Sequence, residues 1–238
     1  MLRKIINKLA PQPKNDYLLS EELFVRKRLR ILERYGINTI LDVGANTGQY
    51  ATQTLSGGFK GSIISFEPLP NEFAEIERKA KDFTWKAYNY ALGDENGDAE
   101  INYSENSYSS SLLELKQETV DAIPATRVVN KIAIKVFRLD HVWDSLNIQG
   151  RNIFLKIDAQ GFEEKVLIGA GKKLEQVKGI QLEMSLRQLY EGEKLYDEMI
   201  RFLKQQGFTL CLVDSGYMNE QTDELLQMDG VFMRIGQP

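Results

Sequence analysis

The stretch Ile37-Asn-Thr-Ile-Leu-Asp-Val-Gly-Ala-Asn-Thr-Gly-Gln-Tyr50 decides the fold that this chain can adopt. Its apolar run over 39–43 is typical of a buried parallel strand, and a helical pattern begins at Gln49. Between them, Gly44 and Gly48 permit backbone angles and close approaches that a β-carbon would forbid. The stretch therefore predicts a strand, a tight glycine loop and a helix N-terminus, which together can cradle a polar or anionic ligand. The alternative is an ordinary turn that needs glycine only for its geometry.

A carboxylate follows at the end of the next predicted strand. That strand covers 62–67, and Pro68 holds Glu67 in an extended conformation at the strand's carboxyl end. A carboxylate there can accept hydrogen bonds from both ribose hydroxyls of an adenosine. A dinucleotide-binding loop needs further glycines where this chain has Asn46 and Gln49, which argues against NAD. The loop instead resembles motif I of class I methyltransferases that use S-adenosylmethionine (SAM), a ligand without a pyrophosphate.

The composition excludes several classes of function. A length of 238 residues suits one α/β domain, and the net charge of −4 gives no general attraction to nucleic acid or anionic membranes. The single cysteine, Cys211, cannot form an intrachain disulfide and fits a reducing compartment, while one His141 beside one cysteine excludes a Cys/His zinc site. No apolar run approaches the length of a membrane span. We therefore expect a cytoplasmic protein without a nucleic-acid partner or a transmembrane segment, and homo-oligomerisation stays open.

Predicted strands and helices alternate along most of the chain. We expect strands at 39–43, 62–67, 85–92, 99–103, 131–137, 152–158, 179–185, 208–213 and 230–235. We expect helices at 20–35, 47–56, 70–81, 139–146, 163–170 and 195–206. Such alternation predicts a mostly parallel sheet with right-handed crossovers, helices on both faces and a final antiparallel strand pair.

An N-terminal unit over 1–36 precedes the main domain over 37–238. It is predicted to begin as a loose arm, because Pro11 and Pro13 break any early helix, and to continue as the helix at 20–35. The basic residues of that helix are expected to face water, although they could instead grip an acidic substrate. They are Arg26, Lys27, Arg28, Arg30 and Arg34.

The segment 104–131 differs in character from the rest of the domain. It begins with a cluster of serines and carries Pro124 in its middle, so it is an insertion rather than a core element. We expect a lid over 104–124, with Ser110 and Ser111 near the cofactor.

Several blocks of the sequence resemble one family in particular. They are Asp42-Val-Gly-Ala-Asn-Thr-Gly48, Phe66-Glu-Pro68, Ala91-Leu-Gly93, Lys156-Ile-Asp-Ala-Gln-Gly-Phe-Glu163 with Val166-Leu-Ile-Gly-Ala170, and Met228-Asp-Gly-Val-Phe232. In this combination and order they resemble the FkbM family of class I SAM-dependent methyltransferases, over about residues 38–235. One departure is Leu139-Asp-His141, where that family often has a second acidic residue after the aspartate.

The resemblance implies a Rossmann-like α/β fold with a mostly parallel seven-stranded sheet and a C-terminal antiparallel strand. It also implies transfer of a methyl group from SAM to an oxygen, with a sugar, glycan, glycosylated metabolite or polyketide hydroxyl as acceptor. The cofactor-binding residues expected on this basis are Asp42, Gly44, Ala45, Asn46, Gly48, Gln49, Glu67, Pro68, Leu69, Ala91, Leu92, Ser110, Ser111 and Asp158.

Four residues are candidates for catalysis. Asp158 ends a core strand at the edge where α/β sheets bind ligands, so it can orient the acceptor hydroxyl or remove its proton; alternatively, it caps a turn. Glu163 opens a helix and Glu183 lies late in a strand, and each has a structural alternative as well. Lys156 shares a strand face with Asp158, where an ion pair is the simpler explanation. The three carboxylates could hold Mg²⁺ through oxygen ligands, but no metal is predicted.

Other functions compete with O-methylation. The chain lacks the Asn-Pro-Pro-Tyr or Asp-Pro-Pro-Tyr loop of enzymes that methylate a flipped base, and it has no basic excess. A SAM-binding module without catalysis would be expected to have an altered Asp158 region, which is intact here. Methyl transfer to a nitrogen of a small molecule stays open.

Overall fold

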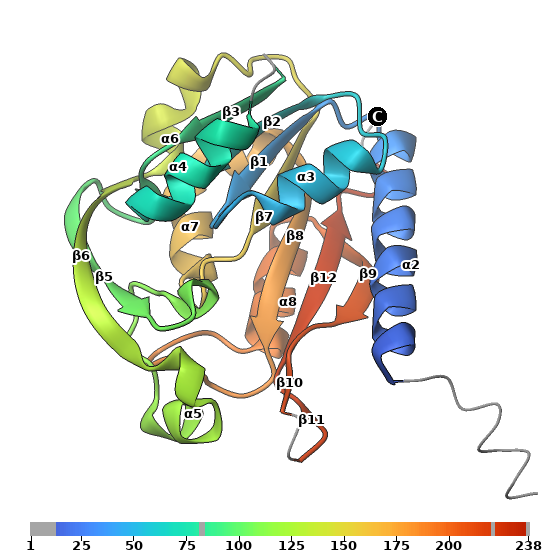
Figure 1. Ribbon diagram of the computed structural model, residues 1–238. Coiled ribbons are helices and arrows are strands. Elements are labelled where there is room, and N and C mark those ends of the chain that lie inside the picture. Colours follow the sequence, from blue (N-terminus) through green and yellow to red (C-terminus); the bar gives the residue numbers. More distant parts are fainter. Residues whose placement is uncertain (1–12, 81–83, 220–221, 237–238) are drawn as a thin grey trace, which may run out of the picture.

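A central seven-stranded sheet organises the protein, whose computed structural model describes residues 13–80, 84–219 and 222–236 (Figure 1). Its strands lie in the order β3 (Trp85–Tyr88), β2 (Ser62–Phe66), β1 (Thr39–Val43), β7 (Ile153–Ile157), β8 (Val177–Ser185), β12 (Gln227–Met233) and β9 (Thr209–Ser215). Neighbouring strands run parallel except at β12, which is antiparallel to both β8 and β9. The predicted mostly parallel sheet with a C-terminal antiparallel strand is therefore confirmed.

Helices cover both faces of this sheet, as predicted (Figure 1). One face carries α2 (Pro13–Arg34), α3 (Gln49–Ser56) and α4 (Pro70–Lys79), and the other carries α6 (Leu139–Val142), α7 (Glu163–Ala170) and α8 (Tyr196–Gln205). Because successive strand residues point to opposite faces, Ile40 packs with the first group of helices and Leu41 with the second. All residues of β1 are buried, which explains its continuous apolar run.

The strand predicted over 85–92 is in fact two strands in two sheets. β3 ends at Tyr88, and β4 (Ala91–Leu92) joins β5 (Gly97–Ser104) and β6 (Val128–Phe137) in a separate three-stranded sheet. Between them, the Asn89 side-chain amide donates to the main-chain oxygens of Glu67 and Pro68. These contacts turn the chain away from the central sheet and bring the second sheet beside the end of β2.

The N-terminal helix is longer than predicted. It begins at Pro13 rather than at Ser20, since the first residue of a helix needs no amide proton for an intrahelical bond. The part of the predicted arm over 1–12 lies outside the described residues. One basic residue of this helix is not in water: Arg28 is only 2% exposed.

The segment 104–131 contains only short elements. They are the 3₁₀ turns Ser107–Ser109 and Pro124–Thr126 and the helix α5 (Gln117–Ala122), after which β6 begins earlier than predicted. The remaining elements are the 3₁₀ turns Trp143–Leu146 and Gly171–Gln176 and the short ribbon of β10 (Met218–Asn219) and β11 (Glu224–Leu225). Within the described residues, no helix combines the length and the apolar character needed to cross a bilayer.

Candidate active site

The glycine loop after β1, residues 44–48, lies directly against the loop after β7. Gly44 has φ +68°, and a β-carbon built on it would be 1.8 Å from the main-chain oxygen of Asp158. Gly48 has φ +81°, and its β-carbon would be 2.7 Å from the ring of Trp85. Both glycines are therefore needed for close packing, and Gly44 in particular lets the two loops meet at the carboxyl edge of the sheet.

Glu67 fastens the glycine loop to the end of β2. Its Oε2 accepts a hydrogen bond from the backbone amide of Asn46 at 2.7 Å, and its Oε1 accepts one from the amide of Leu69 at 2.9 Å. Burial raises the pKa of this carboxyl to about 8, although both amide bonds act to lower it. Glu67 also lines the neighbouring cavity. This position supports its predicted contact with a ribose, which stays a prediction.

A cavity of about 200 Å³, which we call the cofactor cavity, opens between the glycine loop, the end of β2 and the second sheet. The predicted cofactor residues that line it are Gly44, Asn46, Glu67, Pro68, Leu69, Ala91, Leu92, Ser110, Ser111 and Asp158. Apolar walls that the sequence did not reveal come from Phe66, Ile101 and Phe162. The residues present fit SAM, because a carboxyl group at the end of β2 adjoins a chamber with these apolar side chains in its wall.

The other predicted cofactor residues lie outside this cavity. Asp42 is fully buried beneath the glycine loop, where Oδ2 accepts a hydrogen bond from Ser65 and Oδ1 lies 3.2 Å from Lys156 Nζ. Gly48 packs on Trp85, as described above. Ala45 and Gln49 line a second cleft instead, and Gln49 Nε2 donates to the Tyr108 hydroxyl at 3.0 Å.

Lys156 connects the floor of the site to both loops. The predicted ion pair with Asp158 is present at 3.6 Å, but the contact with Asp42 is shorter and Nζ also donates to the main-chain oxygen of Gly44 at 3.1 Å. Burial alone would lower the pKa of Lys156, yet the Asp42 and Asp158 carboxylates outweigh it and raise that pKa. Lys156 is therefore a buried cation that positions the glycine loop, a contact that the strand pattern could not reveal.

Gln160 bridges two of the predicted catalytic carboxylates, Asp158 and Glu183. The side-chain Nε2 of Gln160 donates to Asp158 Oδ1 at 2.8 Å and to Glu183 Oε2 at 2.7 Å. The amide oxygen of Gln160 accepts a hydrogen bond from the Tyr190 hydroxyl at 2.9 Å, and its backbone has φ +52°. Burial, followed by the charges of Asp158 and Asp229, raises the pKa of Glu183 well above its ordinary value. A strained residue with a fully bonded side chain is typical of a site whose geometry matters for function.

Glu163 accepts hydrogen bonds from the backbone of the loop that follows Asp158. Its Oε1 accepts the backbone amides of Ala159 at 2.8 Å and Gly161 at 3.2 Å. Burial raises its pKa to about 8, and the nearby charge of Asp158 adds to the shift. The structure thus gives Glu163 a bonding pattern that holds the loop, while a direct catalytic contact stays a prediction.

A larger polar cleft of about 640 Å³ adjoins the cofactor cavity. The two share Gly44, Asn46, Tyr108, Asp158 and Glu183, so Asp158 lies at their common boundary. The far wall of this polar cleft comes from α2, α3, β8 and β12, and includes Arg28, Tyr50, Gln181 and Asp229. His141 is exposed on α6 and stacks on Phe137, with ring centroids 6.0 Å apart. Over the described ranges, no group of three or more His, Cys, Asp or Glu side chains is arranged to hold a metal ion.

Known proteins share parts of this sequence and fold. A curated relative, the 2-O-methyltransferase NoeI of Sinorhizobium fredii, is 26% identical over 162 residues, which cover 65% of this chain and 66% of the relative. Two solved structures are similar in fold. The SAM-bound fibrillarin of Aeropyrum pernix has 11% identity and a TM-score of 0.43, covering 82% of this chain and 66% of that one. TehB of Haemophilus influenzae has 10% identity and a TM-score of 0.45, covering 86% of this chain and 59% of that one.

The family assignment rests on the match with a family domain. Residues 42–210, which span the glycine loop, Glu67 and the Asp158 loop, match the methyltransferase FkbM domain. The cofactor predicted from the sequence, SAM, is the methyl donor of this class. The protein therefore belongs to the FkbM family of SAM-dependent methyltransferases.

Proposed function

We propose that this protein is an O-methyltransferase that acts on a hydroxyl of a sugar, glycan or glycosylated metabolite. The observation that carries the proposal is the place of Asp158, a residue that lines both the cofactor cavity and the polar cleft. A group at that boundary can touch an acceptor held in the cleft beside a methyl donor held in the cavity. The curated 2-O-methyltransferase relative supports oxygen as the acceptor atom.

Two neighbouring side chains fix the position of the Asp158 carboxylate. Gln160 holds Oδ1 by a hydrogen bond, and Lys156 Nζ lies 3.6 Å from Oδ2. A carboxylate fixed in this way can accept a hydrogen bond from the acceptor hydroxyl and take its proton as the oxygen becomes bonded to carbon. SAM, when bound, supplies the electrophilic methyl group. Much of the rate gain would come from positioning the hydroxyl and from excluding water, to which the segment 104–124 contributes.

The binding of SAM in the cofactor cavity can be tested separately. Glu67→Ala removes a carboxyl group from the cavity wall and should weaken SAM binding by about 1–3 kcal/mol, the cost of leaving a buried hydrogen-bond partner unsatisfied. Titration calorimetry of the wild-type and variant proteins measures this directly. Tight NADH binding with no SAM binding by the wild-type protein would overturn the assignment of the cavity.

The reaction is tested with isotopically labelled SAM and a panel of glycosides. We expect the label in a methyl ether of the acceptor, identified by mass and by stability to mild base. A labelled amine product would favour N-methylation instead. SAM binding without transfer to any hydroxyl or amine compound would favour a non-catalytic binding module.

A further inference from the structure

The polar cleft presents hydrogen-bond acceptors to whatever enters it. Five carboxylates line it: Glu21 of α2, Asp214 of β9, and a group formed by Asp158, Glu183 and Asp229. Asp229 lies directly opposite Glu183 in the β8–β12 pairing. Asp229 belongs to the motif 228–232 but was not predicted as a site residue. Its place in the cleft follows from sheet register, since paired antiparallel residues project to the same face.

In the group of Asp158, Glu183 and Asp229, one oxygen of each carboxylate is held by a glutamine amide. Gln160 bonds to Asp158 and Glu183, and Gln227 also donates to Glu183 Oε2 at 2.8 Å. Gln181 donates to Asp229 Oδ1 at 2.8 Å. The second oxygens of Glu183 and Asp229 have no hydrogen-bond partner within the described part of the chain, and they are not among its buried unpaired atoms. They are therefore open to the cleft as acceptors.

The cations at the floor of the cleft are already engaged with protein groups. Lys156 lies between Asp42 and Asp158. Arg28 donates to Thr54 at 3.1 Å, to Gln53 at 3.2 Å and to Gln181 at 3.4 Å, and its remaining Nε is buried. Both side chains are also buried, with Arg28 2% and Lys156 6% exposed, so a ligand in the cleft meets little of either cation.

We propose that Asp229 is a specificity-determining residue of the acceptor site: it accepts a hydrogen bond from a second donor group, hydroxyl or ammonium, beside the reacting hydroxyl, and it rejects acceptors that carry an anion there. This inference rests on the proposed function, because it assumes that the reacting hydroxyl lies on Asp158. Burial raises the pKa of Asp229 to about 6, so the group is ionised at neutral pH in a site that already disfavours negative charge. Placing a second anion against it would cost several-fold to many-fold in affinity, since like charges in contact repel strongly when partly desolvated.

The test compares matched methyl glycosides of several hexoses in neutral, amino and uronate forms. Binding to the S-adenosylhomocysteine-loaded protein is measured by calorimetry near neutral pH, together with transfer of labelled methyl from SAM. We expect the neutral and amino glycosides to bind at least about tenfold more tightly than the uronates, and Asp229→Asn to reduce that ratio to about threefold or less. The asparagine can still accept the Gln181 hydrogen bond, so the fold should be retained.

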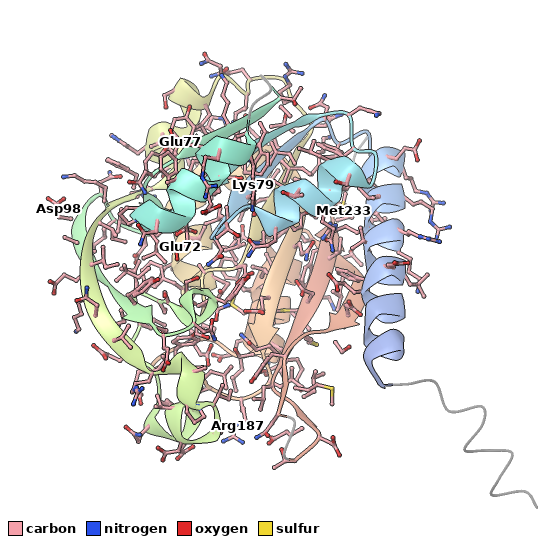
Figure 2. The ribbon with its side chains drawn as sticks, viewed as in Figure 1. Glu72, Glu77, Lys79, Asp98, Arg187 and Met233 are labelled. Atoms are coloured by element: carbon pink, nitrogen blue, oxygen red, sulfur yellow. The ribbon has the colours of Figure 1, made fainter. Side chains whose placement is uncertain are left out.

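Asp98→Asn is the matched control. Asp98 is an exposed carboxylate of β5, and Figure 2 shows it at the left edge of the molecule, well away from Met233, the last residue of β12. This control should leave the ratio unchanged, which separates a local effect from a change in net charge.

The outcomes separate this inference from the proposed function. Uronates bound as tightly as neutral glycosides, an unchanged ratio in Asp229→Asn, or no binding by any neutral or amino glycoside would each overturn the role of Asp229. The wild-type comparison decides the matter even if the variant does not fold. Failure of SAM and S-adenosylhomocysteine to bind would instead overturn the proposed function itself.

Discussion

The β-carbon that Gly44 lacks would lie 1.8 Å from the main-chain oxygen of Asp158. This contact joins the loop that faces the cofactor cavity to the loop that carries the proposed acceptor-binding carboxylate. The Asp158 amide reinforces it by donating to the main-chain oxygen of Val43 at 3.1 Å. The two halves of the site are thus positioned by one another.

Gly44→Ala should displace both the glycine loop at the cofactor cavity and the loop that carries Asp158. The new methyl group would force the loops apart, and the left-handed backbone adds about 1–2 kcal/mol to an overpacking cost of about 1–3 kcal/mol. We expect lower stability in urea unfolding and a large loss of SAM affinity by calorimetry. Gly58→Ala is the control, because Gly58 has φ +101° but nothing within 4 Å of its β-carbon position, so only the backbone cost applies. Equal effects of the two substitutions would contradict the steric explanation.

Lys156→Met should destabilise the fold rather than merely slow the reaction. It leaves the fully buried Asp42 carboxylate without its partner, which costs about 3–5 kcal/mol in such pairs. Adding Asp42→Asn should recover part of that loss. By comparison, Lys135→Met removes one side of an exposed ion pair with Asp98 and should cost at most about 1 kcal/mol. Urea unfolding of all four proteins measures the difference; a double variant no more stable than Lys156→Met would argue against the pair.

Glu163 should make the protein less stable as the pH rises. Its folded-state pKa of about 8 is above the ordinary value of 4.5, so the folded state keeps a proton that the unfolded state has lost. The free energy of unfolding therefore decreases between about pH 4.5 and pH 8 and then levels off. Glu163→Gln, which can still accept the loop amides, should show a smaller decrease, by on the order of 5 kcal/mol, since one pKa unit corresponds to about 1.4 kcal/mol. Glu164→Gln makes the same charge change one residue away, and an identical slope in both variants would contradict the assignment.

The segment 104–124 should become better protected when SAM binds. It already contacts the site through the Ser111 hydroxyl, which donates to the main-chain oxygen of Gln160 at 2.7 Å. It also contacts the Tyr190 hydroxyl, whose single proton is shared between Gln160 Oε1 and the main-chain oxygen of Ser109 at 3.0 Å. Hydrogen exchange with and without SAM and acceptor tests whether it closes further as a lid. Ser111→Ala should speed exchange there by about fivefold, the effect of one hydrogen bond near 1 kcal/mol. Unchanged protection across 104–124 would show a fixed wall rather than a lid.

Local sequence patterns were enough to predict the architecture. The apolar run at 39–43 and the glycines after it predicted β1 and its loop, and the alternation of strands and helices predicted the sheet. The split of 85–92 was missed because it depends on Asn89, whose partners lie more than twenty residues away in the chain. A period-two pattern carries no information about such contacts.

The site was predicted less completely than the fold. Asp158 and Glu67 were proposed as site residues because strand ends are where α/β sheets bind ligands, and the structure places both beside the cofactor cavity. The buried place of Asp42 depends on its register with Lys156, and that of Asp229 on its register with Glu183. Gln160 was missed because nothing in a turn sequence shows that a side chain will bridge two carboxylates. Residues whose function depends on pairing between distant strands become visible only in the structure.

The central claim is that Asp158 acts on the acceptor and not on the cofactor. Asp158→Asn keeps the shape of the side chain but removes the carboxylate that would bind the hydroxyl and take its proton. The decisive measurement is paired: SAM affinity by calorimetry and kcat by transfer of labelled methyl to an identified acceptor. We predict that SAM affinity changes little while kcat falls by about 10²–10⁴-fold, the range for a positioned acid or base. A variant with near-normal kcat, or one that loses SAM affinity outright, would contradict the claim.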